Sequence, residues 1–330
     1  MESEITVMPK ISIVVPVYNR ADEMRELISS LAANNTEKIE LIVVEDGSIK
    51  PCKDELFGVI DKFPVKYIFV DNGGPAKARN IGSKEARGEY LLFLDSDVVL
   101  PHGYIDSVLR NINLTNADAF GGPDSASDDF TDIQKAINYA MTSVLTTGGI
   151  RGKGSYMEKF KPRSFNMGCK KEVFDRLGGF ASELRFGEDI DLSLRLIENK
   201  YHVLLFQDSY VYHKRRLDFR KFFKQVYNSG MARVIIENRH KGSTKLVHLL
   251  PMFFTIAVFV SSLTITVPFY VMIFFHSLLW ERNSLNVSML SPVASFVQLF
   301  GYGLGYIVGL INKYLLAKGQ FSAFEKTFYD

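Results

Sequence analysis

Residues 88–100 read GEYLLFLDSDVVL, and the rest of the chain is organised around them. An apolar, β-prone run at residues 90–94 lies between a glycine and two aspartates, Asp95 and Asp97. Such a short, bounded run is typical of a strand that is buried on both faces. Open α/β sheets bind ligands just past the ends of their strands, and two acids at alternate positions can reach one divalent cation and its phosphates. The alternative is an ordinary turn, because Asp and Ser are common turn residues.

Three further β-prone runs precede this strand, and segments with helical spacing separate them. The predicted strands are residues 11–17, 39–44 and 65–70, and the predicted helices are residues 21–33, 54–62 and 76–87. This alternation predicts an α/β fold with a doubly wound, mostly parallel sheet.

Polar loops follow three of these strands: YNR at residues 18–20, EDGS at 45–48 and DSD at 95–97. Because the carboxyl ends of parallel strands meet at one edge of a sheet, these loops predict a nucleotide site at that edge. GGPA at residues 73–76 opens a helix whose free N–H groups can face a phosphate, although Gly-Gly-Pro is also an ordinary turn.

The composition excludes some classes of protein. The chain has 330 residues, is 47% hydrophobic and carries a formal net charge of +2, which suffices for one large or two small domains. Two cysteines, Cys52 and Cys169, lie far apart and give neither a disulfide framework nor a zinc-binding spacing. Basic residues gather between residues 214 and 245, whereas residues 246–280 contain no Asp, Glu, Lys or Arg.

The ordered motifs VVPVYNR, VVEDGS, GGPAKARNIG and LDSD, followed by FNMGCKKEVF, GGF and GEDIDLSLRL, resemble family 2 glycosyltransferases of the GT-A fold. The resemblance covers about residues 10–213. It implies a nucleotide-diphospho-sugar transferase domain whose donor is a nucleotide-sugar, with a UDP-sugar favoured. Glu45 is a small departure, because the family often has an aspartate there.

The resemblance also implies a donor site, whose residues are Pro16, Tyr18, Arg20, Asp46, Arg79 and Asp95. In that site Asp46 holds the base or ribose, Arg79 approaches the diphosphate, and Asp95 binds ribose or metal-bound water. A solvated helix face is the alternative for Arg79. Residues 146–163, rich in Gly, Lys and Arg, are predicted to close over the donor or to be a plain surface loop.

A divalent cation is expected at the same edge. By resemblance, Asp97 ligates Mg²⁺ or Mn²⁺ and His213 is a further protein ligand. A structural role is the alternative for His213, because a lone histidine is more often structural than a metal ligand.

The pair Glu188-Asp189 matches the acidic pair of the family, in which the aspartate is the general base. The resemblance therefore implies that Asp189 takes a proton from the acceptor hydroxyl, that Glu188 orients it, and that sugar transfer inverts the anomeric centre. Asp191 is expected to be structural. The alternative for the whole acidic group is helix capping, because acids are favoured in a first helical turn.

The C-terminal part predicts membrane contact. Residues 217–237 form a basic amphipathic helix, suited to an anionic membrane surface and preferred over nucleic-acid binding because apolar sequence follows. Residues 249–275 and 289–311 are each long and apolar enough to span a bilayer as a transmembrane hairpin. Glycines recur every four residues in the second run, at Gly301, Gly305 and Gly309. They predict close packing against the first span or a homodimer through this face.

Three domains follow from these patterns: a catalytic domain at residues 1–215, an interfacial helix at 216–247, and a transmembrane hairpin with a tail at 248–330. Basic flanks on both outer sides of the hairpin predict a multi-pass protein of the cytoplasmic membrane, with the catalytic domain and both termini cytoplasmic. QVYNSG at residues 225–230 replaces the Q-x-x-R-W of processive relatives, which favours single-sugar transfer.

The expected acceptor is a lipid-linked or envelope glycan. Two other functions are the alternatives. A sugar-1-phosphate nucleotidyltransferase shares the nucleotide-binding sheet but requires a Gly-rich basic N-terminal loop, which residues 16–19 are not. A non-catalytic membrane adaptor on a transferase-like domain is disfavoured by the complete set of acids.

Overall fold

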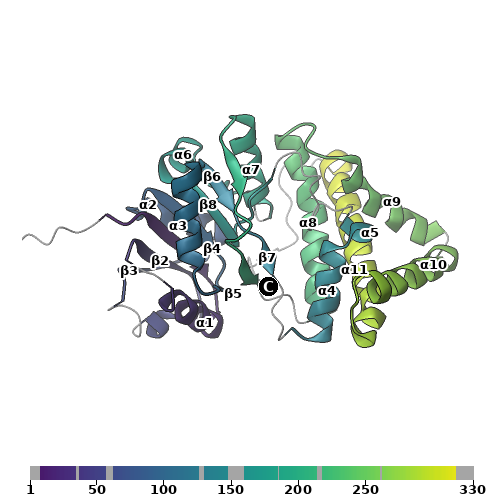
Figure 1. Ribbon diagram of the computed structural model, residues 1–330. Helices are drawn as coiled ribbons and strands as arrows, with labels where there is room; N and C mark the ends of the chain where they lie inside the picture. The colour runs from purple at the N-terminus through teal and green to yellow at the C-terminus, as the bar shows by residue number, and fades with distance from the viewer. Residues whose placement is uncertain are drawn as a thin grey trace, which may run out of the picture. The chain divides into compact units, whose positions relative to one another are not determined.

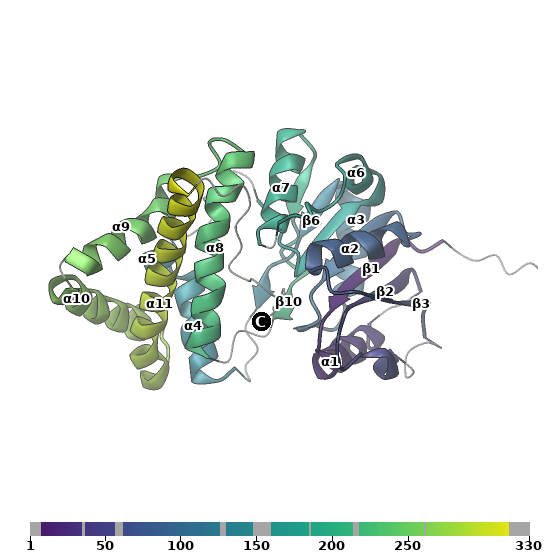
Figure 2. The same ribbon diagram turned by 180° about the vertical axis from the view of Figure 1, so that it is seen from behind.

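The computed structural model describes residues 8–34, 37–56, 62–125, 130–147, 160–184, 186–213, 218–260 and 262–316. These residues form two compact units (Figures 1 and 2). The sheet unit contains the described residues of 8–125 and 160–213, and the helical unit contains those of 130–147 and 218–316.

The sheet unit is built on a seven-stranded, mostly parallel sheet in the order β3-β2-β1-β4-β8-β6-β9. Its strands are β1 (Ile11–Val17), β2 (Ile39–Asp46), β3 (Val65–Val70), β4 (Tyr90–Leu94), β6 (Ala119–Gly121), β8 (Asn166–Lys170) and β9 (Val203–Leu205). The four N-terminal strands pair in parallel, whereas β8 runs antiparallel to both β4 and β6. The parallel sheet expected from the alternating pattern is confirmed.

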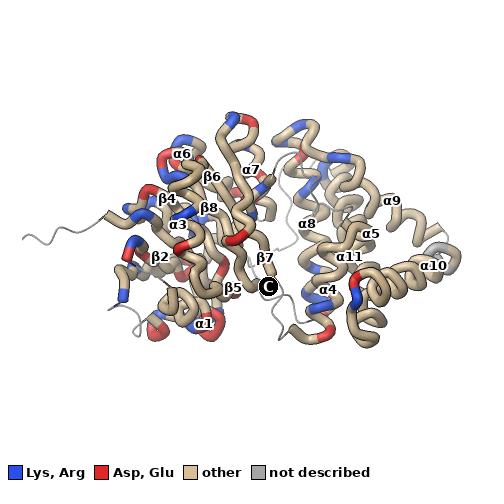
Figure 3. The backbone as a smooth tube through the Cα atoms, in the orientation of Figure 1, with Lys and Arg blue, Asp and Glu red and all other residues tan. Residues whose placement is uncertain are grey.

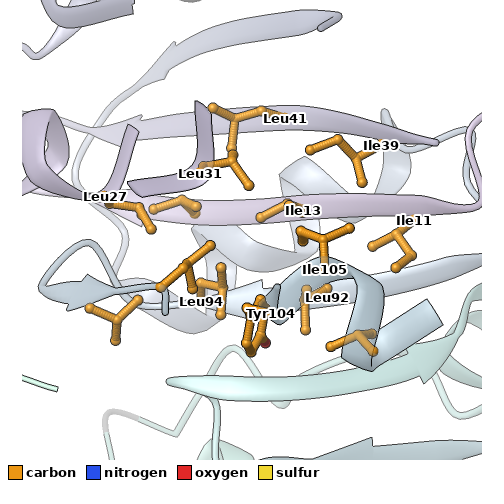
Figure 4. Packing of buried hydrophobic residues seen from close by; sticks show 14 of the residues in the cluster. Ile11, Ile13, Leu27, Leu31, Ile39, Leu41, Leu92, Leu94, Tyr104 and Ile105 are labelled. Carbon is orange, nitrogen blue, oxygen red and sulfur yellow. The ribbon is translucent and has the colours of Figure 1, made fainter. Parts of the chain in front are cut away.

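Helices cover both faces of this sheet, because nearly every residue of the central strands is apolar and successive side chains point to opposite faces. One core cluster packs Ile13 of β1 and Leu92 of β4 against Leu27 and Leu31 of α1 (Ala21–Ala32) and against α3 (Tyr104–Thr115) (Figure 4). The opposite cluster packs Val14 and Phe93 against α2 (Pro75–Lys84), α6 (Lys171–Arg176) and α7 (Glu188–Glu198). Of the helix expected at 54–62, the structure gives only the short 3-10 turn η1 (Lys53–Leu56), and residues 57–61 lie outside the described residues.

A second, three-stranded sheet joins distant segments beside the carboxyl edge of β4. It consists of β5 (Val98–Val99), β7 (Asp124–Ser125) and β10 (Val211–His213), with β10 in the middle. In the register of this sheet His213 lies opposite Val98, the residue after Asp97. The fold therefore brings the backbone of His213 next to the DSD loop.

The helical unit is arranged around one long helix, α11 (Leu285–Leu310). The helices packed against it are α4 (Asp132–Thr142), α5 (Val144–Thr147), α8 (Phe219–Arg239), α9 (Leu246–Val260) and α10 (Ser262–Phe275). Two π-helical turns, η2 (His276–Trp280) and η3 (Ile311–Leu315), continue α10 and α11. The first helix of the unit, α4, begins at a capping box between Thr131 and Gln134.

This arrangement corrects the expected domain boundaries. Residues 126–158 were expected in the catalytic domain, but α4 and α5 belong to the helical unit. The physical reason is apolar packing: Ile137 and Met141 of α4 bury their side chains with Phe222 of α8 and Val287 of α11. The helical unit is therefore assembled from an insertion in the sheet unit and from the C-terminal part of the chain.

The expectation that residues 217–237 lie on a membrane surface is also wrong for the apolar side of this helix. In α8 the side chains of Phe222, Val226, Val234 and Ile236 are buried within the helical unit. Basic side chains on α8 remain exposed, but the apolar stripe that a membrane surface requires is already covered.

The expected first span over residues 249–275 is two helices, not one. Helix α9 ends at Val260 and α10 begins at Ser262, and the two run in different directions (Figures 1 and 2). In the described part of the chain, one helix, Leu285–Leu315, is long and apolar enough to cross a membrane, and a core helix of a soluble protein meets the same criteria. The second predicted span, residues 289–311, lies within this helix, and the described residues do not show the two-span hairpin.

The glycine face of α11 has its partner within the chain. A Cβ atom at Gly305 would lie 1.9 Å from the carbonyl oxygen of Tyr227, and one at Gly301 would lie 2.7 Å from Val226, both on α8. Gly309 faces Val234 and Met231 of the same helix. The homodimer expected through this face is wrong, because α8 occupies it.

Candidate functional site

Arg79 connects three parts of the chain at the carboxyl edge of the sheet. From α2, its Nη2 donates to Oδ1 of Asp95 at 2.6 Å and its Nη1 donates to Oε1 of Glu188 at 3.0 Å. The guanidinium carbon lies 5.6 Å from the ring centroid of Phe180. With only 3% of its surface exposed, Arg79 is not on a solvated helix face. The structure thus brings together the loop after β4 and the start of α7.

Close packing of α2 makes this reach possible. Gly82 lies against the sheet, where a Cβ atom would come within 2.5 Å of Val14 and 3.0 Å of Val44. Because Gly82 lacks a Cβ, α2 approaches the strands closely, and Arg79 on the same helix can reach Asp95 and Glu188.

A second arginine holds the other aspartate of the DSD loop. Arg20 follows β1, and its Nη1 donates to Oδ2 of Asp97. The strands β1 and β4 are neighbours in parallel, so the loops that follow them meet at one edge. The two predicted site residues are therefore in direct contact. Of the others on β1, Pro16 is buried opposite Val44 and Tyr18 is partly buried.

The acidic pair at the start of α7 has two different environments. Arg163 Nε donates to Oδ2 of Asp189 at 2.6 Å, and the backbone N–H of Ile190 donates to Oδ1 at 2.7 Å. Burial alone raises the pKa of Asp189, but the charge and hydrogen bond of Arg163 outweigh it and leave this pKa below its ordinary value. Burial and the neighbouring charge of Asp189 raise the pKa of Glu188 to about 7, against the opposing effect of Arg79.

Asp46 binds the glycine loop before α2. Its Oδ1 accepts from the N–H of Gly73 at 2.7 Å and its Oδ2 accepts from the N–H of Gly74 at 2.9 Å. Gly74 has φ of 90°, a conformation that glycine adopts without strain. The carboxylate of Asp46 therefore positions this loop, while its expected contact with base or ribose stays a prediction.

Sequence reasoning missed Arg163 and underrated Glu45. The carboxylate of Glu45 is fully buried and accepts hydrogen bonds from Ser48 Oγ, from the N–H of Cys52 at 2.7 Å and from the hydroxyl of Tyr67 at 3.2 Å. It therefore fastens the loop after β2. Arg163 lies two residues before the FNMG motif, but nothing local indicates its partner 26 residues away.

Asp191 has the structural role that was expected of it. Its carboxylate accepts from Arg195 Nε at 2.8 Å, and the same guanidinium donates to the carbonyl oxygens of Leu177 and Gly179. The basic loop at 146–163 falls mostly on residues 148–159, which lie outside the described residues, and the side chain of His213 lies outside them as well.

The acids at this edge fit a cation that arrives with a phosphate ligand. Among the described side chains, no group of three His, Cys, Asp or Glu residues forms a ready metal site. Asp95 and Asp97 supply two carboxylates, and Mg²⁺ is often held by one or two carboxylates together with substrate phosphates. Each of these carboxylates also contacts an arginine, Asp97 with Arg20 and Asp95 with Arg79.

The chain is similar in sequence to known glycosyltransferases. An uncharacterised glycosyltransferase of Haemophilus influenzae is 30% identical over 198 residues, which are 57% of this chain and 62% of that protein. A pre-mycofactocin glycosyltransferase of Mycobacterium tuberculosis is 28% identical over 237 residues, which are 71% of this chain and 49% of that protein. The chain therefore spans about half to three fifths of the length of these relatives.

Two solved structures share the fold. The mannosyltransferase PcManGT from Pyrobaculum calidifontis, in complex with GDP-Man and Mn²⁺, aligns with a TM-score of 0.58 at 16% identity, over 95% of this chain and 89% of that one. S. aureus TarS aligns with a TM-score of 0.52 at 18% identity, over 96% of this chain and 94% of that one. The expected GT-A fold is confirmed. The sequence profile "Glycosyl transferase family 2" matches residues 12–182, just over half of the chain, and the protein belongs to that family.

Proposed function

We propose that this protein is an inverting glycosyltransferase that moves one sugar from a nucleoside-diphosphate donor to an acceptor hydroxyl. The observation that carries the proposal is the Arg79 bridge between Asp95 and Glu188. Through these two contacts, the buried Arg79 joins the loop after β4, at the edge where a nucleotide donor would bind, to the acidic pair of α7. The donor and the acceptor hydroxyl would therefore meet at the place where Asp95 and Asp189 are already held.

The donor is proposed to bind along the carboxyl edge of β1, β2 and β4. PcManGT was solved with GDP-Man and another TarS structure, with a TM-score of 0.50, with UDP, which supports a nucleotide-sugar donor without deciding the base. Arg20 and Arg79 bring two positive charges to this edge. Guanidinium groups bind phosphate oxygens in a bidentate manner, so both are suited to the diphosphate.

A divalent cation, Mg²⁺ or Mn²⁺, is proposed to be held by Asp97 and His213, with Asp95 bound to ribose or to a coordinated water. Bound there, the cation would offset negative charge on the departing diphosphate. The Mn²⁺ in PcManGT supports this assignment. Arg20 would have to give up its contact with Asp97 and would then be free to turn to the diphosphate.

Asp189 is proposed as the general base. Its Oδ2 would accept the proton of the acceptor hydroxyl as the acceptor oxygen attacks the anomeric carbon. The bond from that carbon to the diphosphate breaks at the same time, and the nucleoside diphosphate leaves from the opposite side. Glu188 would orient the site through Arg79. This single displacement inverts the anomeric centre and requires no protein nucleophile.

The acceptor is proposed to be a lipid-linked or envelope glycan, and the protein is proposed to act at the cytoplasmic membrane with its sheet unit and both termini in the cytoplasm. This step is supported by the uncharged sequence at residues 246–280 and by the cytoplasmic supply of nucleotide-sugars. No nucleic-acid partner is proposed.

The test is a screen of UDP-, GDP- and dTDP-sugars for Mn²⁺- or Mg²⁺-dependent release of nucleotide, with membrane lipid extract as acceptor. We expect one donor to release nucleoside diphosphate, and we expect a chelator to abolish that release. Release of pyrophosphate from a nucleoside triphosphate and a sugar phosphate would instead identify a nucleotidyltransferase. Nucleotide binding without turnover for any donor would favour the non-catalytic adaptor.

A further inference from the structure

Helices α9 and α10 carry an exposed apolar surface that is continuous along both. On α9 the exposed side chains are Leu246, Leu250, Phe253, Ile256, Phe259 and Val260, each between 45% and 79% exposed. From Leu246 to Phe259 they recur at intervals of three or four residues and therefore form one stripe, and Val260 adjoins its end. On α10 the corresponding side chains are Val267, Val271, Met272 and Phe275. Figure 3 shows no Lys, Arg, Asp or Glu on either helix.

The opposite sides of these helices are fixed against α11. A Cβ atom at Gly303 would lie 2.1 Å from the carbonyl oxygen of Pro251 and 2.2 Å from Oγ1 of Thr255 on α9. Thr255 is fully buried, and its hydroxyl lies 3.3 Å from the carbonyl oxygen of Phe300. On α10, Ile273 is also fully buried. Each helix therefore has one face packed on α11 and another that is exposed. Neither helix can rotate to bury its apolar stripe without losing its packing against α11.

Helices α9 and α10 approach each other at a tip, which we define by the exposed side chains of Phe259 and Val260, and they diverge toward a polar base. In Figures 1 and 2 they leave opposite ends of α11 and come together at the junction between residues 260 and 262. At that junction Phe259 and Val260 are 70% and 79% exposed. Exposed Lys241 and Lys245 precede α9, exposed Trp280 ends η2, and exposed Glu281 and Arg282 follow it. Tryptophan and basic residues are favoured at the level of lipid headgroups.

These features do not fit a pair of membrane spans. Helix α9 has 15 residues, about 22 Å, whereas a hydrocarbon core is about 30 Å thick. Helix α11 packs along α8, whose exposed Lys221 and Lys224 could not accompany it through a bilayer without a large desolvation cost. In space, α11 therefore packs on one side against α8, which carries exposed lysines, and also against α9 and α10, which carry no Lys, Arg, Asp or Glu.

We infer that the α9–α10 hairpin inserts tip-first into the hydrocarbon of one leaflet and does not cross the bilayer. Burial of the stripe on both helices and of the tip drives insertion. Lysines at the base contact anionic headgroups, and α8 stays in water. This inference rests on the membrane attachment proposed above and changes its form. Both ends of the hairpin lie on the same side of the membrane, so the sheet unit and the acceptor headgroup share one compartment.

The depth of the tip is measurable with a fluorescent label. The two native cysteines, Cys52 and Cys169, are fully buried, so Phe259→Cys can be labelled selectively with an environment-sensitive dye in the full chain. The labelled protein is added to preformed vesicles of phosphatidylcholine and phosphatidylglycerol. We expect a blue shift, quenching by lipids that carry a nitroxide in mid-chain, and protection from an impermeant reductant on either side. Lys224→Cys, on the exposed side of α8, is the matched control and should remain accessible from the outer side.

Three results would overturn the inference. Reaction of the label with reductant trapped inside the vesicles would mean that the chain crosses. Reaction with reductant added outside, at an undiminished rate, would mean that the tip does not insert. A blue shift that needs no vesicles and grows with protein concentration would mean that a second copy covers the tip.

A charge at the tip gives an independent test. Phe259→Asp should weaken vesicle binding by about tenfold or more, because an aspartate resists transfer to hydrocarbon. Leu114→Asp replaces an equally exposed apolar residue on α3 of the sheet unit and should leave vesicle binding unchanged. Nucleotide binding is measured on both variants. If Phe259→Asp binds nucleotide but leaves vesicle binding intact, the inference fails while the proposed function stands.

Discussion

Arg163 holds Asp189 through a 2.6 Å contact between Nε and Oδ2, and this contact lies on the oxygen that the proposed general base would use. Asp189 is buried, whereas the side chain of Arg163 is 36% exposed. The ion pair keeps Asp189 ionised, which a base requires, but it also covers the lone pairs that would accept a proton. For Asp189 to act as the proposed base, Arg163 would have to shift toward another anion when substrates bind, and the donor diphosphate is the anion that the proposed reaction supplies.

Replacing Arg163 should shift the pH dependence of turnover. Without the guanidinium, burial raises the pKa of Asp189, so Arg163→Gln should move the acidic limb of the kcat/KM profile upward by about one to three pH units. Arg176→Gln removes an exposed arginine on α6 and should leave the profile unchanged. An unshifted acidic limb in Arg163→Gln would argue against Asp189 as the titrating base.

The two acids of the pair can be separated by amide substitution. Asp189→Asn should lower kcat by about a hundredfold or more while donor affinity stays within a few-fold, because general-base catalysis contributes on this order. Glu188→Gln should act mainly through Arg79 and reduce donor affinity. Since the pKa of Glu188 is raised to about 7, a pH profile that rises through neutrality and is lost only in Glu188→Gln would instead identify Glu188 as the base.

The raised pKa of Glu188 also predicts how stability depends on pH. The folded chain favours the protonated carboxyl, so its contribution to the free energy of unfolding is complete below the ordinary pKa of 4.5 and is lost as pH rises to about 7. Glu188→Gln should flatten this part of the stability profile in denaturant titrations between pH 4.5 and 7. An unchanged slope would show that Glu188 is ionised throughout in the native state.

Removal of Arg79 should damage both stability and donor binding. Arg79→Gln leaves Glu188 and Asp95 without their shared guanidinium, and breaking a buried ion pair costs about 3–5 kcal/mol. The double variant Arg79→Gln/Glu188→Gln should recover part of the melting temperature but not the nucleotide affinity. Lys77→Gln, at an exposed position on the same helix, is the control and should change neither quantity.

Two glycines of α11 should respond differently to the same substitution. Gly305→Ala places a Cβ 1.9 Å from the backbone oxygen of Tyr227, so α8 and α11 must separate at a cost of about 1–3 kcal/mol. At Gly309 the closest atom to an added Cβ is 3.0 Å away on the side chain of Val234. Gly309→Ala should therefore be nearly neutral, because the gain in helix propensity offsets a small repacking. Thermal unfolding of both variants in the same lipid or detergent checks this order.

Local sequence patterns were sufficient to predict the sheet and the edge at which the candidate site lies. Apolar runs such as residues 90–94 are local patterns, and the polar residues at the ends of such strands mark the binding edge without knowledge of the neighbours. This pattern is sufficient to predict Arg20, Asp95 and Asp97 at the edge, whereas Arg79 and Asp189 lie on helices and are predicted only by the resemblance to the family. The ordered motifs were sufficient to indicate the family.

Tertiary structure alone decided which side chains meet. Arg79 and Glu188 are 109 positions apart, and no local pattern pairs them. It also decided which surfaces the apolar stripes pack against. Hydrophobic burial is not directional, so an apolar stripe in the sequence predicts that the stripe is covered but not what covers it. The stripes of α4 and α8 proved to be packed inside the helical unit, and the glycine face of α11 against α8. The uncharged run after Leu246 folds into a hairpin because α9 and α10 each pack on α11. Composition alone does not predict this packing.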